Sequence, residues 1–78
     1  MRQSIILDEA IVTMRKMMDI FNEDTSDEAM RHTIERCDVI GQKTKRLTSE
    51  IIDQISKVVL QTGYSVSDVL TRMEREDL

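Results

Sequence analysis

Cys37 and His32 are the single cysteine and the single histidine of the sequence, and they are the side chains best suited to nucleophilic or metal chemistry. A catalytic thiol needs a base beside it, and His32 is the only imidazole available. Five positions separate the two residues, so on a helix they point to different faces and cannot share a metal ion well. Glu28 and His32 have the i, i+4 spacing that a metal can use, but two ligands do not close a site. We expect a buried thiol at Cys37 and a surface histidine at His32.

Adjacent carboxylates occur as Asp8-Glu9, Asp27-Glu28 and Glu76-Asp77. A general acid needs an apolar or crowded surrounding that raises its pKa, whereas these pairs fall on polar positions that we expect to face solvent. The two glycines of the sequence cannot form a glycine-rich phosphate loop. The sequence therefore predicts a protein that is not an enzyme and that uses no metal and no cofactor.

The composition predicts one small domain over residues 1–78. The chain carries 11 basic and 15 acidic residues, a formal net charge of -4, and its apolar content of 40% is too high for a disordered tail. A core of this size gives modest stability, and one cysteine cannot form an internal disulfide, so we expect a second subunit. No run approaches the ~20 apolar residues of a membrane span and no secretory signal is recognisable, so we expect a cytoplasmic protein without membrane contact.

Helical periodicity of the apolar residues runs through almost the whole chain and predicts an all-α fold. An amphipathic helix is expected over 5–21. Thr25 and Glu28 then have the spacing of a capping box, which marks the start of a second helix. Because the connection is short, the first two helices are expected to form an antiparallel hairpin.

The second helix is expected to be long. No proline interrupts 25–62, and we favour one continuous helix there, with a bend or break in the stretch from Gly41 to Thr48 as the alternative. Gly63 suits the left-handed residue that follows a helix, and a short C-terminal helix is expected over 66–76.

The lengths of these helices predict a homodimer. A first helix of 17 residues covers ~25 Å, less than half of the ~57 Å of a continuous helix over 25–62. Apolar residues in 51–60 then lie beyond its reach. We therefore expect a dimeric helical bundle, formed through 47–73, in which a second chain covers this surface.

A helix-turn-helix-like corner over 54–73 offers an alternative function, that of a dimeric DNA-binding transcriptional regulator. The expected second helix of this corner carries four acidic residues against two basic ones, which repels a phosphate backbone and argues against nucleic acid as a partner. The candidate DNA contacts are the basic cluster before the corner and the two arginines within it: Lys43, Lys45, Arg46, Arg72 and Arg75.

Residues 47–56 faintly resemble the second helix of the small helical aspartyl-phosphate phosphatases of sporulating bacteria. The signature of that family is a serine followed a few residues later by Leu-Asp. Here Ser56 is followed by Lys-Val-Val-Leu-Gln without an aspartate, so the resemblance does not bring the phosphatase activity with it.

Helix-mediated binding of another protein is the function that the sequence favours. A methionine-rich helical face adapts to partners of different shape, and a helix in an apolar groove is a common mode of recognition. An inhibitor, antirepressor, adaptor or chaperone-like regulator of microbial or phage origin fits this description. The candidate contact residues form two sets, one in the first helix and one in the later helices: Met14, Met17, Met18 and Phe21, and Ile52, Val59 and Leu70.

Overall fold

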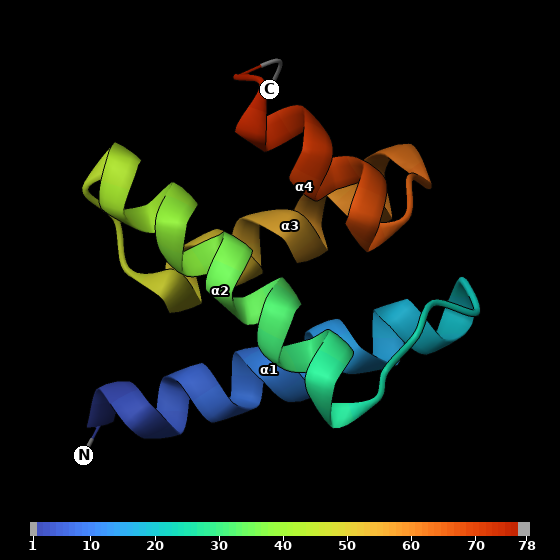
Figure 1. The fold of residues 1–78 in the computed structure, drawn as a ribbon, viewed down its shortest axis with the longest axis horizontal. Helices are drawn as coiled ribbons and strands as arrows, with labels where there is room; N and C mark the ends of the chain where they lie inside the picture. The colour runs from blue at the N-terminus through green and yellow to red at the C-terminus, as the bar shows by residue number, and fades with distance from the viewer. Residues whose placement is uncertain (1, 77–78) are drawn as a thin grey trace.

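Four α-helices make up the fold, and no strand is present among residues 2–76, which the computed structural model describes, with side chains from residue 7 onward. This confirms the prediction of an all-α protein. The molecule measures 31 × 26 × 22 Å along its principal axes. Figure 1 shows the first helix along the lower edge, the second helix rising across it to the upper left, and the last two helices above the first. The helices are α1 (Arg2–Ile20), α2 (Asp27–Thr44), α3 (Thr48–Thr62) and α4 (Val66–Glu74).

Helix α3 is the centre of the packing, because α1, α2 and α4 all lie against it. Its apolar residues recur every three or four positions, which places them on one side of the helix and under all three neighbours. The contacts of α1 are mainly with α3 rather than with α2, so the predicted hairpin of the first two helices is not confirmed. The buried apolar core is formed by Ala10, Met14, Met18, Met30, Cys37, Ile40, Ile51, Ile52, Ile55, Val59, Val66, Val69 and Leu70.

The favoured prediction of one continuous helix over 25–62 is wrong, and the alternative of a break before Thr48 is correct. Helix α2 ends at Thr44 and is capped by Lys45, which adopts the left-handed conformation (φ 58°) and donates its backbone N–H to the carbonyl of Gly41. Helix α3 then begins after Leu47, whose N–H donates to Glu50 Oε1 at 2.9 Å. Sequence patterns miss this break because a left-handed lysine is uncommon, whereas glycine or asparagine would have signalled it.

The break also removes the basis of the length argument for a homodimer. Because α3 folds back across α1, its residues Ile51, Ile52 and Ile55 are at most 1% exposed within a single chain. The prediction that this surface needs a second chain is therefore wrong for its main residues. Leu60 is the exception, since 77% of it stays exposed.

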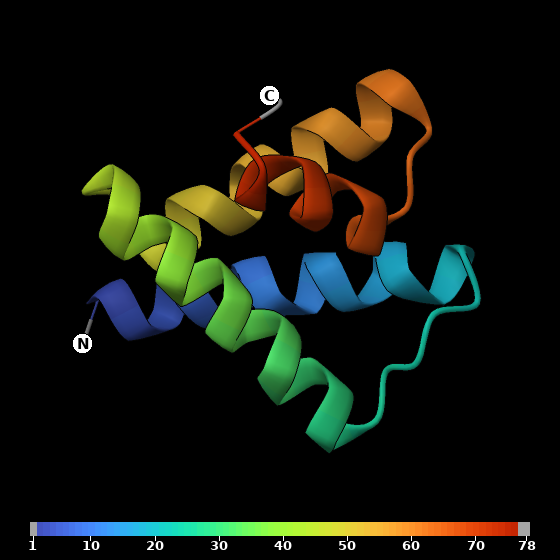
Figure 2. The same ribbon diagram turned by 45° about the horizontal axis from the view of Figure 1, so that its top comes forward.

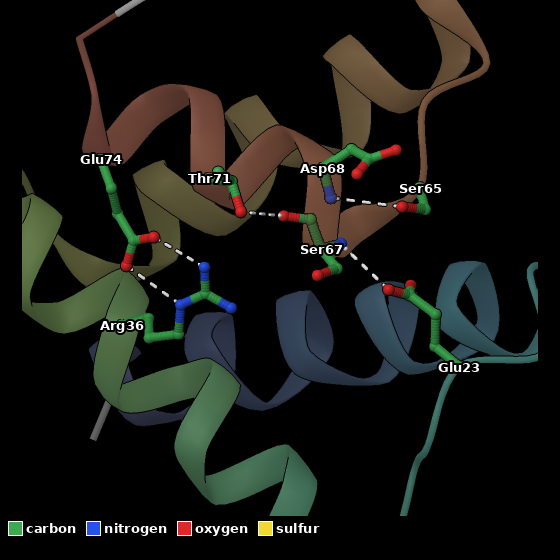
Figure 3. Close-up of polar contacts among 7 residues, drawn as sticks. All are labelled: Glu23, Arg36, Ser65, Ser67, Asp68, Thr71 and Glu74. Carbon is green, nitrogen blue, oxygen red and sulfur yellow. Dashed lines mark hydrogen bonds and ion pairs between the residues drawn. The ribbon is translucent and has the colours of Figure 1, made fainter.

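The helix starts follow local capping rules, with one shift from the prediction. Ser26, not Thr25, caps α2 and accepts a hydrogen bond from the N–H of Ala29 at 3.2 Å. Ser65 caps α4 in the same way through the N–H of Asp68. Figure 3 shows a second contact at this end of α4, where the N–H of Ser67 donates to Glu23 Oε1 at 3.0 Å. A carboxylate is favourable there because a helix N-terminus carries partial positive charge.

Arg36 and Glu74 join α2 to α4 by a two-point ion pair (Figure 3). Nε donates to Oε2 at 3.0 Å and Nη2 donates to Oε1 at 2.6 Å. Hydrogen bonding to Arg36 lowers the pKa of Glu74, and the same contact raises the pKa of the guanidinium. The pair is therefore charged in the folded state at neutral pH.

The ion pair predicts a pH dependence of stability. Because the folded-state pKa of Glu74 lies below its unfolded value, the stabilisation is present above the unfolded pKa and is lost as the pH falls through the folded pKa. We expect Glu74→Gln to lower the free energy of unfolding at neutral pH by up to about 1 kcal/mol, since the pair is partly exposed. Urea titrations at neutral and acidic pH measure this, and the deficit of the variant is expected to shrink in acid. Glu76→Gln, on an exposed carboxylate beyond the helix, is the control; an equal pH dependence in both variants would contradict the assignment.

Candidate protein-binding groove

An open apolar groove of about 300 Å³ lies between α1 and α2. It exists because both helices pack against α3 but make few contacts with each other, as their crossing in Figures 1 and 2 illustrates. We refer to it as the α1–α2 groove. Its floor is formed by Ile11, Met30 and Ile34, and its rim by Arg15, Asp27, Arg31 and Glu35.

The floor comes from the edges of two helical stripes. In α1, Met14 lies at the centre of the apolar stripe and is fully buried, whereas Ile11, one turn earlier, is only half-buried. In α2, Met30 and Ile34 lie one turn apart on the same side of the helix. The apolar stripe of α2 continues through Cys37 into the core, so only the N-terminal half of α2 borders the groove.

Arg15 connects the two walls at one end of the groove. Its Nη2 donates to the carbonyl of Thr25 at 2.9 Å and lies 3.5 Å from Asp27 Oδ1. These contacts attach the start of α2 to α1. Arg31 and Glu35 are exposed along the α2 wall, and their charged groups are available at the rim.

Two further hollows lie near the C-terminal ends of α2 and α4, with volumes of about 190 and 320 Å³, and they share Ile40, Thr44, Met73 and Glu76. Glu74, on the smaller of them, is held by Arg36 from the facing helix. Polar and charged groups make up more of the lining of these two hollows than of the α1–α2 groove, whose lining is mainly apolar. The α1–α2 groove is therefore the better candidate for a binding site.

Most of the residues predicted from sequence to contact a partner lie in the core of the single chain. Met17 is half-buried and Phe21 is 37% exposed, so these two remain partly accessible. The floor of the α1–α2 groove was missed because its residues belong to the same helical stripes as the core. Met30 is itself a core residue, and only the packing of the helices leaves Ile11 and Ile34 half-buried. The predicted contact residues that are at least 94% shielded are Met14, Met18, Ile52, Val59 and Leu70.

The five candidate DNA-contacting residues are spread over the end of α2, the α2–α3 turn and the C-terminal half of α4. Lys45 and Arg46 lie in the turn between α2 and α3, where Arg46 donates to Gln54, and Lys43 borders a hollow with Glu74 and Glu76. Two further residues lie in or beside α4: Arg72, 4.3 Å from the centre of the Tyr64 ring, and Arg75, at the end of the helix. Figure 1 shows the α2–α3 turn and the α3–α4 turn, next to which Arg72 contacts Tyr64, at opposite ends of the molecule, whereas the C-terminal end of α4, with Arg75, lies nearer to the end of α2.

Cys37 and His32 are placed as the sequence predicted. Cys37 is fully buried, and burial raises the pKa of its thiol to about 12, so a thiolate does not form near neutral pH. His32 is exposed on α2, with Nε2 3.9 Å from Glu28 Oε1. Among residues 2–76, no group of three or more histidine, cysteine, aspartate or glutamate side chains is arranged to hold a metal ion.

No helix in the described part of the chain combines the length and the apolar character needed to cross a membrane. No protein-family model, curated protein or solved structure matches the chain. The function is therefore inferred from the chemistry of the α1–α2 groove itself.

Proposed function

We propose that the protein is a small, non-catalytic regulatory or adaptor protein that binds a helix of another protein in the α1–α2 groove. The observation that carries the proposal is an apolar floor left open between two helices that both pack against α3. An amphipathic helix recognises such a groove through side chains spaced three and four residues apart.

The floor has the chemistry that this mode of recognition needs. Ile11 and Ile34 are branched, stiff and half-buried, so they offer apolar contacts to a partner, whereas Met30 is 5% exposed and belongs to the core. The charged rim surrounds this apolar centre, as in many protein interfaces where polar residues border an apolar core. Binding a helix would remove the exposed apolar surface of the floor from water, at roughly 25 cal/mol per Å².

An inhibitor, an antirepressor, an adaptor or a chaperone-like protein of microbial or phage origin would act in this way. Homodimerisation remains a prediction from the small size of the chain, because a domain of this length buries only ~60–65% of its unfolded surface. The α1–α2 groove does not require a second copy of the chain for its formation, since both walls come from one polypeptide.

DNA binding through the 54–73 corner is the second candidate function. In its favour, α3 and α4 are joined by a turn of three residues that begins with Gly63 in the left-handed conformation (φ 74°). Against it, the N–H of Ser67 at the start of α4 already donates a hydrogen bond to the carboxylate of Glu23. Asp68 adds a second negative charge at the same end of the helix. Both oppose phosphate binding, so we rank DNA binding below protein binding.

A selection from a displayed library of 16-residue peptides tests the proposed groove. We expect peptides enriched on the wild-type protein to carry apolar residues at i, i+3 or i+4, and i+7. Ile34→Arg places a charge on the groove floor and is expected to weaken their binding at least about tenfold, or about 1.4 kcal/mol. Fluorescence anisotropy of the selected peptides measures this effect.

Leu60→Arg is the matched control, because it places the same charge on an apolar residue that is 77% exposed on α3. It is expected to leave peptide affinity unchanged, and a random DNA duplex at low salt is expected not to bind either variant. If Ile34→Arg fails to fold, the chemical-shift changes that the selected peptides cause in the wild-type protein show whether they bind in the α1–α2 groove. Selected peptides that perturb residues outside the α1–α2 groove, or a library without enrichment, would refute the proposal.

A further inference from the structure

The break between α2 and α3 is built from residue types that disfavour helix ends. Lys45 caps α2 in the left-handed conformation (φ 58°), which is costly for a residue with a Cβ and suits glycine. Leu47 stands at the N-cap of α3, where apolar residues are the poorest choice, and its side chain makes no capping hydrogen bond. The other helix ends follow the usual preferences, since Ser26 and Ser65 begin α2 and α4 and Gly63 ends α3.

Few local contacts hold this turn, which lies at the left edge of the molecule in Figure 1. The N–H of Leu47 donates to Glu50 Oε1, and the hydroxyl of Thr48 donates to Asp38 Oδ1, both at 2.9 Å. The N–H of Arg46 donates back into the last turn of α2 at 2.8 Å. The three residues between α2 and α3 are lysine, arginine and leucine, which are all good helix formers, so nothing in their types opposes a helical connection.

The core of the molecule lies between the two halves that this turn joins. We call residues 2–44 the N-terminal half and residues 48–76 the C-terminal half. Helices α1 and α2 pack mainly against α3 and make few contacts with each other, so the N-terminal half buries its apolar side chains against the C-terminal half. A second copy of the chain presents an identical C-terminal half, which offers the same contacts to this surface.

We propose that two copies of the chain form a dimer by exchanging halves, with α2 and α3 of each copy joined by a straightened, helical connection. The N-terminal half of each chain packs against the C-terminal half of the other, so the core and the Arg36–Glu74 ion pair form again between chains. Exchange relieves the left-handed conformation of Lys45 and gives up the hydrogen bonds of the turn. The closed single chain predominates at low protein concentration.

The exchange does not depend on the proposed function, but it bears on it. Both walls of the α1–α2 groove come from the N-terminal half of one chain, so the groove moves as a unit and is supported by α3 of the other chain. The dimer then presents two such grooves. A target that carries two binding segments would be held more tightly by the dimer than by the closed chain.

Lys45→Gly and Gly41→Ala are expected to shift the exchange in opposite directions. Glycine adopts the left-handed conformation freely and weakens a helical connection, so Lys45→Gly is expected to lower the dimerisation constant at least about tenfold. A Cβ on residue 41 would lie 2.6 Å from the carbonyl oxygen of Arg46 in the closed turn, whereas alanine favours a helix. Gly41→Ala is therefore expected to raise the dimerisation constant at least about tenfold.

Light scattering after size-exclusion chromatography measures the dimerisation constant over a series of protein concentrations, on protein refolded at millimolar concentration. Gln42→Ala is the matched control, because position 42 is an exposed helical position in the closed chain and stays helical in the exchanged dimer. It is expected to leave the dimerisation constant unchanged.

A mixture of two charge-reversal variants, Arg36→Glu and Glu74→Arg, distinguishes exchange from an ordinary surface dimer. In an exchanged dimer with one copy of each variant, both contacts between α2 and α4 join unlike charges. A dimer of either variant with itself, and the closed chain of either, join like charges at this contact. Native mass spectrometry of the two variants refolded together is expected to show more heterodimer than the statistical proportion.

The proposal is overturned if the wild type and Gly41→Ala both stay monomeric after refolding at millimolar concentration. Dimerisation that Lys45→Gly does not weaken would also overturn it, and so would a statistical mixture of the charge variants, because an ordinary surface dimer predicts both results. If either charge variant does not fold by itself, recovery of the helical circular dichroism signal on refolding the two together supports the exchange, and no recovery counts against it.

Discussion

Met14→Ala is expected to lower the free energy of unfolding by about 2–5 kcal/mol, the largest effect that we predict for a single substitution. Met14 is fully buried where α1 packs against α3, so its truncation removes apolar contacts and leaves a cavity. A domain of this size has a total stability of only about 5–15 kcal/mol. The variant is therefore expected to lose a large share of the stability of the fold.

The measurement is urea unfolding followed by circular dichroism at two protein concentrations. Val12→Ala is the matched control on the same helix, because Val12 is 54% exposed, and it is expected to change the free energy of unfolding by less than about 0.5 kcal/mol. The midpoint shift of Met14→Ala is expected to be independent of protein concentration. A variant that unfolds like the wild type but loses self-association or partner binding would instead support Met14 as a contact residue and contradict its place in the core.

The elements with local signals could be predicted from the sequence. Gly63 and Ser65 end one helix and cap the next, and both do so in the structure through the left-handed φ and the capping hydrogen bond. The helical spacing of the apolar residues correctly predicted an all-α fold. These features depend on neighbours within a few residues, which is why the sequence alone reveals them.

Features that depend on tertiary packing could not be predicted. Ile11 and Met14 belong to one stripe, yet the first borders the α1–α2 groove and the second is buried, because α3 covers only part of the stripe. Lys45, at the break before α3, likewise has no distinctive local signal.

Gly41→Ala distinguishes the folded-back arrangement of α2 and α3 from a continuous helix. Within an uninterrupted helix, alanine in place of glycine stabilises by about 1 kcal/mol. In this structure an added Cβ would lie 2.6 Å from the backbone carbonyl oxygen of Arg46, much closer than van der Waals contact allows. Arg46 belongs to the turn and donates its own N–H to the carbonyl of Gly41 at 2.8 Å, so the turn cannot move away without weakening this bond.

The steric cost therefore exceeds the gain in helix propensity. Overpacking against backbone costs typically about 1–3 kcal/mol, and we expect Gly41→Ala to lower the free energy of unfolding by this amount. Gln42→Ala, at the next and exposed position of α2, is the control and is expected to be neutral or slightly stabilising. Thermal and urea unfolding measure both variants. A gain in stability for Gly41→Ala would mean that α2 runs on past Lys45; α3 would then not fold back over α1, and the α1–α2 groove would lose the support that keeps its walls apart.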